Sequence, residues 1–574
     1  MTDKVQNINL TSPPWPKLRV LVIDDQHSAQ SFMKSMLLRF GIRHIDTASN
    51  YREAISQCQQ AAYQLILVDY HLDHTLNGSE LISLLRKKQL LSADCGLVIF
   101  SADASARVVL SALAVEPDAF MTLPMPLRSL QEKLTQAWRN SQARQPLYQQ
   151  MSEKGFDEGI RYCKEQLLKH GPDYQLESLL LDMLLDKEDW AQAKRYIELF
   201  QTYHPSAKVA LAEARLLAHT TDKHSAIQLL RRLVEKSPMC LDALDLLASY
   251  QSDTGQYHEA MLTAHRALKL NPAASHRALK LAQLAAKTGQ GEPLIQAGMT
   301  LATHLPIIDV GWIICLAEFC ATFEQHYFSQ PEPKVRRQLR RRLNQISDRA
   351  HHRVLPAQRP FLNAFRQITD ARLLLAQGAT LKAKRRLMLG LSGYFGCLNK
   401  LPSVILAEAL PILLQLGETG LIADICQVLK HRDHFDGHSQ FRLQALRENH
   451  CAFEALRKLE SALRTAQSAS QSQPAQALLK FKAILHDYPY CTEANLGKID
   501  CLLRIPQQDC RVDFTPQLSA ISTMPLPPLL SQWRTLLRAQ ISNLPESQFR
   551  NGQYRPLRRE LDPVRIQTWA PLLH

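Results

Sequence analysis

The sequence predicts a doubly wound α/β domain of five parallel strands, followed by an all-α repeat domain. Two observations predict this division. In residues 17–140, short apolar runs rich in β-branched residues alternate with amphipathic stretches, which is the pattern of successive βα units. From about residue 150, alanine- and leucine-rich segments recur every 33 or 34 residues, a period typical of stacked helix pairs.

The α/β domain is expected to contain five βα units. Its strands are predicted at residues 19–23, 44–47, 65–69, 96–100 and 119–122. Helices are predicted between them at residues 28–40, 51–62, 78–88 and 104–113. The first, third and fourth strands are continuous apolar runs, as expected of parallel strands that are covered by helices on both faces of their sheet.

Carboxylates close two of these apolar runs. Asp24 and Asp25 directly follow the first strand, and Asp69 ends the third. Because the carboxyl ends of parallel strands line one edge of a sheet, the three side chains are expected to meet there. Three carboxylates repel one another unless a cation lies among them, and oxygen ligands with open positions suit Mg²⁺. We therefore predict a Mg²⁺ site at these residues; the alternative is that they are ordinary carboxylates at strand ends.

The order of these motifs over residues 18–138 resembles the receiver domain of two-component response regulators. The resemblance implies a flavodoxin-like, CheY-like fold in which Asp24 and Asp25 help to hold Mg²⁺. It also implies that Asp69 accepts a phosphoryl group from a sensor histidine kinase or a phosphotransfer domain. Ser101 matches the hydroxyl residue that contacts the phosphoryl oxygens, and Phe120 matches the aromatic switch position.

One position departs from the family pattern. The usual Thr-Lys-Pro is replaced here by Thr122, Leu123 and Pro124. In the family, the lysine pairs with the phosphoryl oxygens, and a leucine side chain cannot neutralise charge in its place. Two interpretations follow: the domain is phosphorylated without that cation, or it keeps the receiver fold and no longer takes phosphate.

The repeats of the second part resemble the tetratricopeptide (TPR) consensus. Prolines recur at the repeat period, at Pro172, Pro205, Pro238, Pro272 and Pro306. The clearest copy contains Leu244, Leu247, Ala248, Gly255, Tyr257, Ala260, Ala264, Ala267 and Pro272. Small residues let paired helices approach closely, and the proline ends the second helix of each pair. We expect residues 150–505 to form one TPR-like α-solenoid with irregular central units, and the polar run at residues 465–476 to be a loop or a strained helix start.

The ends of the chain have a different composition. Residues 1–16 are polar and contain proline, so they are expected to be a disordered segment rather than a signal peptide. Residues 506–574 form a proline-rich tail that is expected to be partly ordered. No apolar run reaches the roughly 18 to 20 residues that a membrane helix needs, and the twelve cysteines form no Cys-x-x-Cys pair. We therefore expect a cytoplasmic protein with reduced thiols and no membrane association.

Positive charge gathers in the repeat region. The chain has a formal net charge of +14, and its densest basic run is at residues 334–342. Such a run is most often a solvated helix face; it can also be a docking surface for an acidic protein. Nucleic acid is the least favoured ligand, because the run lacks interleaved aromatic residues on which bases could stack. The repeats also lack a phosphate-binding glycine loop, a metalloprotease motif and a nucleophile elbow, so we do not expect an enzyme.

The sequence therefore predicts a two-component response regulator that accepts a phosphoryl group on Asp69. It is expected to signal through protein–protein interaction, with a protein ligand bound in the groove of the TPR-like domain. The alternative is a phosphate-independent adaptor or decoy that docks on a sensor kinase and modulates phosphotransfer to other regulators. A nucleic-acid-binding regulator is the third and least favoured possibility.

Overall fold

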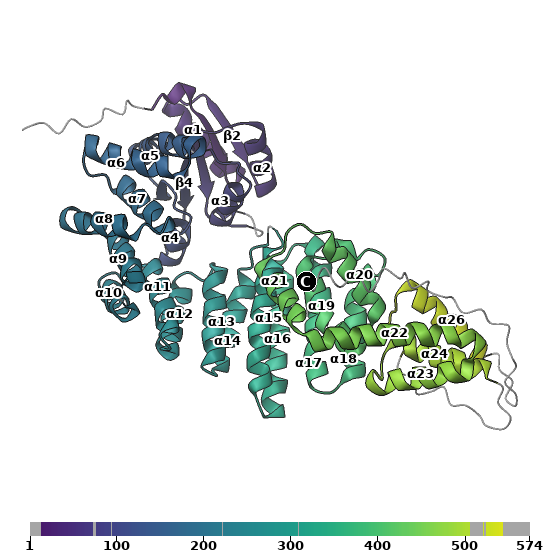
Figure 1. Cartoon of the computed structure of the whole chain (residues 1–574). Coiled ribbons are helices and arrows are strands. Elements are labelled where there is room, and N and C mark those ends of the chain that lie inside the picture. The colour runs from purple at the N-terminus through teal and green to yellow at the C-terminus, as the bar shows by residue number, and fades with distance from the viewer. Residues whose placement is uncertain are drawn as a thin grey trace, which may run out of the picture. The chain divides into compact units, whose positions relative to one another are not determined.

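The structure, a computed structural model, describes residues 13–72, 76–92, 94–220, 222–307, 309–505, 521 and 524–542 (Figure 1). It contains two compact units, Met1–Ile308 and Asp309–His574. Most of the disordered segment expected at residues 1–16, and most of the tail expected at residues 506–574, lies outside the described residues. Within the first of these ranges, Trp15–Lys17 forms a short 3-10 helix (η1), and the Trp15 ring centroid lies 6.0 Å from that of Phe40.

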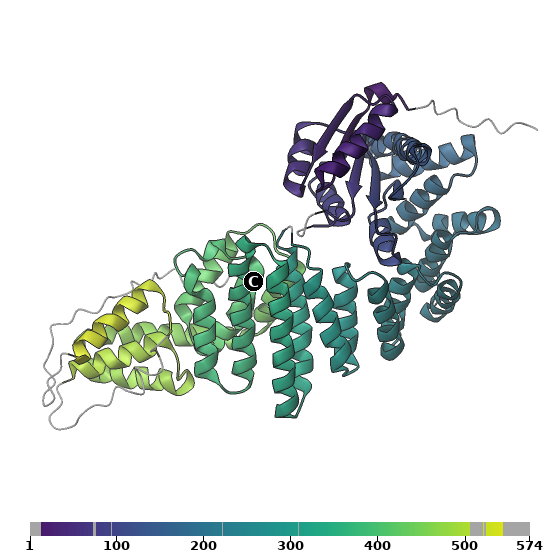
Figure 2. The ribbon, with the colours of Figure 1, turned by 180° about the vertical axis from the view of Figure 1, so that it is seen from behind.

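The first unit begins with a five-stranded parallel sheet in the order β2-β1-β3-β4-β5. The strands are β1 (Arg19–Ile23), β2 (His44–Ala48), β3 (Leu65–Asp69), β4 (Gly96–Ser101) and β5 (Ala119–Thr122). The helices are α1 (His27–Arg39), α2 (Tyr51–Gln60), α3 (Gly78–Lys87), α4 (Ala106–Leu113) and α5 (Leu127–Lys154), and they lie on both faces of the sheet (Figures 1 and 2). The predicted doubly wound α/β fold is confirmed.

Alternate residues of β1 enter two separate cores. Val22 packs in a cluster with Leu37 of α1 and Leu134 of α5 on one face of the sheet. Ile23 packs in a second cluster with residues of α2 and α3, including Leu85, on the other face. Burial on both faces explains why the central strands are uninterrupted apolar runs, and it leaves polar side chains only where each strand ends.

Helix α5 crosses the domain boundary that we expected at residues 140–150. It is one helix from Leu127 to Lys154, with Pro146 inside it. Arg144 lies in the part of α5 beyond the sheet and pairs with Asp118, whose side chain is only 2% exposed. Asp118 also accepts a hydrogen bond of 2.9 Å from the backbone N–H of Leu97 at the start of β4. The sheet therefore holds α5 as far as Arg144, past residue 140, where the α/β domain was expected to end.

The rest of the first unit is helical. Its helices are α6 (Phe156–His170), α7 (Tyr174–Asp186), α8 (Trp190–Tyr203), α9 (Ala207–Thr220), α10 (Lys223–Lys236), α11 (Leu241–Asp253), α12 (Tyr257–Leu270), α13 (Ser275–Lys287) and α14 (Gly291–Thr303). Repeat positions on α11 and α12, including Leu244, Ala248, Ala260 and Ala264, are buried. Gly255 between the two helices has a φ of +80°, a conformation that favours glycine. Consecutive helices thus pack as pairs, and their closer assignment as TPR units stays a prediction.

The second unit is also helical among its described residues. It contains α15 (Gly311–Ser329), α16 (Pro333–Arg353), α17 (Arg359–Ala376), α18 (Thr380–Leu391), α19 (Ser403–Leu416), α20 (Thr419–Lys430), α21 (Gly437–Glu448), α22 (His450–Ser472), α23 (Pro474–Asp487), α24 (Thr492–Arg504) and α26 (Pro528–Ser542). Three short 3-10 helices are η2 (Pro356–Gln358), η3 (Ser392–Tyr394) and η4 (Leu398–Lys400). The region expected as one solenoid over residues 150–505 is thus divided between two units. No helix in the described part of the chain is long and apolar enough to cross a membrane.

Of the two alternatives expected for residues 465–476, the loop is wrong, and a helix start does lie within the run. Helix α22 continues to Ser472, and only Gln473 separates it from α23, which begins at Pro474. Ala466 and Ser470 are buried on α22. Packing of these small residues against neighbouring helices stabilises a helix that the polar composition alone did not indicate.

Candidate phosphoryl-acceptor site

Three carboxylates meet at the carboxyl end of the sheet. Asp24 and Asp25 follow β1, Asp69 ends β3, and one carboxylate oxygen of each lies within 4.8 Å of those of the other two. Asp24 is buried, Asp69 is partly buried and Asp25 is exposed. The convergence predicted from the strand ends is confirmed.

A glutamine on α1 fixes the backbone beside this cluster. The side-chain amide of Gln30 donates hydrogen bonds to the carbonyl oxygen of Asp24 (2.6 Å) and to that of Ala48 at the end of β2 (3.2 Å). The carboxylate of Asp24 in turn accepts a 2.8 Å hydrogen bond from the backbone N–H of Gln26. We predicted no role for Gln30 from the sequence. The feature that could have indicated one is a polar residue at a position of α1 that faces the core, where Gln30 is 6% exposed.

Electrostatics at the cluster favour a bound cation. Burial, and then the negative charge of Asp24, raise the pKa of Asp69 to about 6, although the backbone N–H of His71 opposes the shift. Burial also raises the pKa of Asp24. These shifts mean that full ionisation of the cluster is unfavourable without a compensating charge. An oxygen-only donor set with one exposed member, Asp25, fits Mg²⁺, which keeps several water ligands.

The start of α3 approaches Asp69 closely. The backbone N–H of Gly78 donates a 2.8 Å hydrogen bond to the carbonyl oxygen of Tyr70. A Cβ atom at position 78 would lie 2.4 Å from the carbonyl oxygen of Asp69. Only glycine therefore lets α3 begin here, directly behind the strand end that carries the carboxylate.

Ser101 lies at the neighbouring strand end. The β3–β4 register pairs Asp69 with Phe100, so Ser101 is one residue further along β4. Its side chain is fully buried, and its hydroxyl oxygen accepts a 3.1 Å hydrogen bond from the backbone N–H of Asp103. The hydroxyl hydrogen is not used in that bond, so Ser101 can donate to an anion at this edge of the sheet.

Comparison with known proteins decides what this domain is. Residues 20–135 match the sequence model of the family described as the response regulator receiver domain. Residues 20–135 are a response regulator receiver domain. The match covers the receiver domain and does not extend to the helical remainder of the chain.

Solved structures similar to the receiver domain come from several bacteria. The response regulator protein TrrA from Thermotoga maritima, in complex with Mg(2+)-BeF, is 28% identical over 21% of this chain and 98% of that chain, with a TM-score of 0.19. A two-component response regulator from Clostridium difficile is 26% identical over 21% of this chain and 97% of that chain, with a TM-score of 0.20. The chemotaxis protein CheY4 from Vibrio cholerae is 21% identical over 21% of this chain and 98% of that chain, with a TM-score of 0.20.

Phe120 lies in β5 of the receiver domain, opposite Ile99 in the β4–β5 register. Its ring is partly buried and packs against the apolar cluster that contains Val108 of α4 and Ile99. The position therefore connects β5 with α4. Its role as a switch stays a prediction.

Leu123, the position at which the resemblance implies a lysine, directly follows β5. Its backbone N–H donates a 2.8 Å hydrogen bond to the carbonyl oxygen of Ser101, so position 123 is held beside the site. Its side chain is partly buried and packs against the apolar cluster that contains Phe100 and Met121. The side chain of Leu123 therefore adds to the core and not to the charge balance of the site.

Proposed function

We propose that this protein is a two-component response regulator that accepts a phosphoryl group on Asp69 from a histidine kinase or a phosphotransfer domain. The observation that carries the proposal is the meeting of Asp69 with Asp24 and Asp25 at the end of β3 in a receiver domain. The raised pKa of about 6 still leaves Asp69 mostly ionised near neutral pH, so a carboxylate oxygen is available as the nucleophile.

The transfer can be written with Asp69 as the attacking group and the donor's phosphohistidine as the group that is cleaved. An oxygen of Asp69 attacks the phosphorus in line, the bond between phosphorus and the donor's imidazole nitrogen breaks, and its electron pair leaves with the imidazole. The product is an acyl phosphate on Asp69. The hydroxyl of Ser101 would donate a hydrogen bond to a phosphoryl oxygen. Mg²⁺ held by Asp24, Asp25 and Asp69 would neutralise negative charge on the phosphoryl group.

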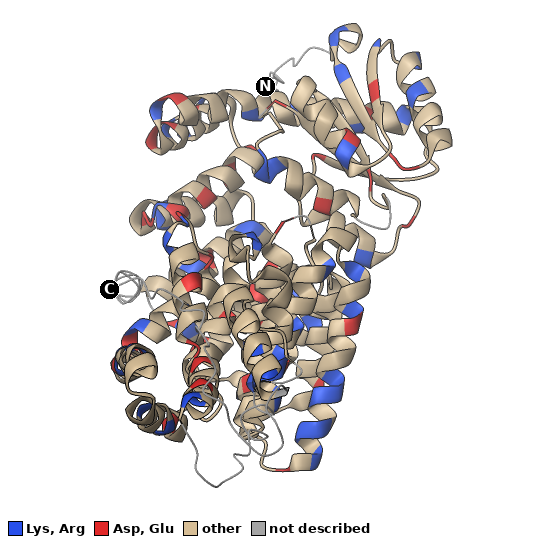
Figure 3. Ribbon diagram, turned by 90° about the vertical axis from the view of Figure 1, so that its right-hand side faces the viewer, with Lys and Arg blue, Asp and Glu red and all other residues tan. Residues whose placement is uncertain are grey.

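The output we propose is protein binding by the helical region, with no enzymatic activity of its own. Support comes from consecutive packed helix pairs, an architecture that offers extended surfaces to peptides and helices. The exposed side of α16 supplies a further feature: Lys334, Arg337, Arg341 and Arg349 are exposed at successive positions along it, and Figure 3 shows this basic row on one long helix. An acidic segment of a partner would fit such a row.

A labelling experiment tests the phosphoryl acceptor. Intact protein incubated with acetyl phosphate and Mg²⁺ should give one shifted band in Phos-tag electrophoresis and a mass increase of one phosphoryl group. EDTA or Asp69→Asn should abolish both. Asp242→Asn, which removes an exposed carboxylate of α11, is the matched control and should label normally. Labelling that persists in Asp69→Asn would place the acceptor elsewhere.

A phosphate-independent adaptor or decoy is the second candidate, and Leu123 is the observation that favours it. Without the family cation, the phosphorylated and unphosphorylated states should differ less in stability, because a switch is driven only by contacts that differ between its states. Such a protein would dock on a sensor kinase equally well in both states. Kinase affinity measured with and without beryllofluoride decides between the candidates: a large difference supports the phosphorylation-dependent regulator, and none supports the adaptor.

A further inference from the structure

Helix α21 buries a smaller share of its residues than α15 and α19, the helices on which it packs. Only three of its 12 residues, His438, Ser439 and Leu443, are buried, whereas ten of the 14 residues of α19 are buried. Phe441 of α21 is 67% exposed. Leu443 is the one buried apolar side chain of α21, so polar contacts contribute to the attachment of this helix.

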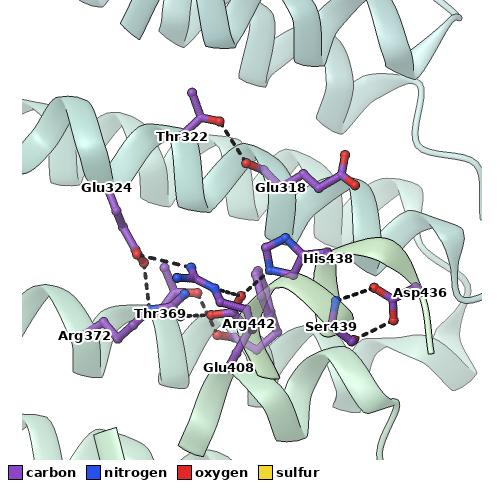
Figure 4. Close-up of polar contacts among 11 residues, drawn as sticks. Glu318, Thr322, Glu324, Thr369, Arg372, Glu408, Asp436, His438, Ser439 and Arg442 are labelled. Atoms are coloured by element: carbon purple, nitrogen blue, oxygen red, sulfur yellow. Dashed lines mark hydrogen bonds and ion pairs between the residues drawn. The ribbon is translucent and has the colours of Figure 1, made fainter. Parts of the chain in front are cut away.

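Those polar contacts reach two other helices, α15 and α19 (Figure 4). Nε of Arg442 donates to Oε1 of Glu408 on α19 at 3.0 Å, and Nη2 of Arg442 lies 3.9 Å from Oε2 of Glu324 on α15. His438, one turn earlier on α21, also bonds to Glu408. Among the described residues, Nη2 of Arg442 has no hydrogen-bond partner. Ion pairs thus help to attach α21, and one of the donor groups of Arg442 is left without a hydrogen-bond acceptor among the described residues.

The surface beneath α21 is built from alternate helices. α15 contacts α17, α17 contacts α19, and α15 also contacts α19, so the three form one continuous face. Each contributes a charged side chain: Glu324 from α15, Arg372 from α17 and Glu408 from α19 (Figure 4). Arg372 pairs with both glutamates, with 2.9 Å between its Nε and Oε1 of Glu324. Glu318 of α15 interacts electrostatically with His438 from the same face.

The charge of this face sets what it can bind. Glu318, Glu324 and Glu408 supply three formal negative charges and Arg372 one positive charge, so the face carries −2 when α21 is not counted. The charged group that α21 adds at its centre is the guanidinium of Arg442. A helix that places an arginine in the same position would satisfy the same carboxylates, since the planar guanidinium matches carboxylate geometry.

We propose that the face formed by α15, α17 and α19 is a binding site for an arginine-bearing helix of a partner protein, and that α21 occupies this site in cis until the partner displaces it. The inference rests on the proposed protein-binding output and names the site and the chemistry of its ligand. Tethering gives α21 an effective concentration in the millimolar range for short linkers. A partner therefore competes with α21 and does not enter an empty site.

A peptide of this chain's own sequence is the direct probe. A labelled synthetic peptide of residues 433–449 is added to the intact protein and to Arg442→Glu, in which a third carboxylate beside Glu324 and Glu408 should release α21. The peptide should bind Arg442→Glu at least about 10-fold more tightly than wild type, because its cis competitor is weakened. Arg457→Glu reverses an exposed charge on α22 and is the matched control; it should bind like wild type.

Two further peptides test the arginine itself. The same peptide with Arg442→Glu should not bind the released face, whereas a peptide with Phe441→Ala should bind normally because Phe441 points to solvent in the folded chain. Equal binding of the three peptides, or no binding to a folded Arg442→Glu protein, overturns the proposal.

Hydrogen exchange on the unmodified protein keeps the proposal testable if Arg442→Glu does not fold. Amides of α21 should exchange at least about 10-fold faster than those of α15, α17 and α19, because weakly packed elements open locally before the rest. Protection of α21 equal to that of α19 overturns the proposal. If a native partner binds wild type and Arg442→Glu with the same affinity, the proposed protein-binding output is supported. The partner then does not bind at the face formed by α15, α17 and α19.

Discussion

At the residue scale, Asp69 is both the proposed nucleophile and a source of instability in the metal-free protein. Its pKa in the folded chain is about 6, above the ordinary value of 3.8. A carboxyl group with a raised folded-state pKa contributes stability that is complete below pH 3.8 and is lost as pH rises through 6. The contribution of Asp69 to the stability of the metal-free receiver domain should therefore be less favourable at pH 7 than at pH 4.

Asp69→Asn should accordingly stabilise the metal-free receiver domain at pH 7 by about 2 kcal/mol. Hydrogen exchange of β1 and β3 amides in the intact chain measures the difference. At pH 4 the gain should largely disappear, because Asp69 is then protonated in the folded wild type. Saturating Mg²⁺ should stabilise wild type more than Asp69→Asn. A gain that is the same at both pH values would mean that charge repulsion is not its cause.

Leu123 offers a second test at the same scale. Leu123→Lys should restore a cation beside Ser101 and so enlarge the change in β4, α4 and Phe120 that beryllofluoride produces, by about 1 kcal/mol of coupling free energy. Amide exchange with and without beryllofluoride measures it. Met125→Lys is the matched control, since Met125 packs against the same apolar cluster two residues further on. If both lysines act alike, added positive charge and not the family position explains the effect.

At the scale of secondary-structure elements, the α/β domain could be predicted from sequence almost completely. Its strand pattern is periodic and local, and burial on both faces leaves few alternative arrangements, so residues 65–69 and 96–100 were assigned correctly. The carboxylates at strand ends followed from the same rule. The full length of helix α5 did not follow from this rule. The composition changes near residue 145, although the helix continues. The pairing of Arg144 with Asp118 joins two residues that no sequence pattern relates.

Contacts made by α21 show the same limit. His438 and Arg442 lie in a short polar stretch with no repeat signal. Their shared partner Glu408 is 30 residues from His438 and 34 from Arg442, and Glu324 is farther still along the chain. Charged residues at helix positions are usually solvated, so their burial could not be inferred without the arrangement of α15, α17 and α19. Gln30 was missed for the same reason: its partners are backbone oxygens of two other strand ends.

The Arg144 contact gives a prediction for α5. Arg144→Ala leaves the buried carboxylate of Asp118 without its cation and should destabilise the receiver domain by about 3 kcal/mol. Hydrogen exchange of β4 and β5 in the intact protein measures this loss. Arg139→Ala removes an exposed arginine of the same helix and should cost little. Adding Asp118→Asn to Arg144→Ala should recover part of the loss, because the unpaired charge is then gone; a purely additive double variant would contradict the ion-pair explanation.

At the scale of the whole molecule, the formal charge of +14 should make association with acidic partners dependent on salt. Charge reversal of Arg337, Arg341 and Arg349 on α16 should weaken binding of poly-L-glutamate to the intact protein by about 10-fold at low ionic strength and much less at high ionic strength. Reversal of Arg231, Arg232 and Lys236 on α10 is the matched control. Equal losses in both triple variants would mean that net charge, and not the row on α16, governs binding.

The unbroken course of α5 has a consequence for how this protein can be rearranged. Each residue of an α-helix turns the chain by about 100°, so one residue inserted near position 150 would rotate everything after it relative to Arg144 by that angle. Seven inserted residues complete nearly two turns and restore the original phase to within about 20°. Chimeras that exchange the receiver domain should therefore work only at joints that preserve helical phase, a constraint that a flexible linker would not impose.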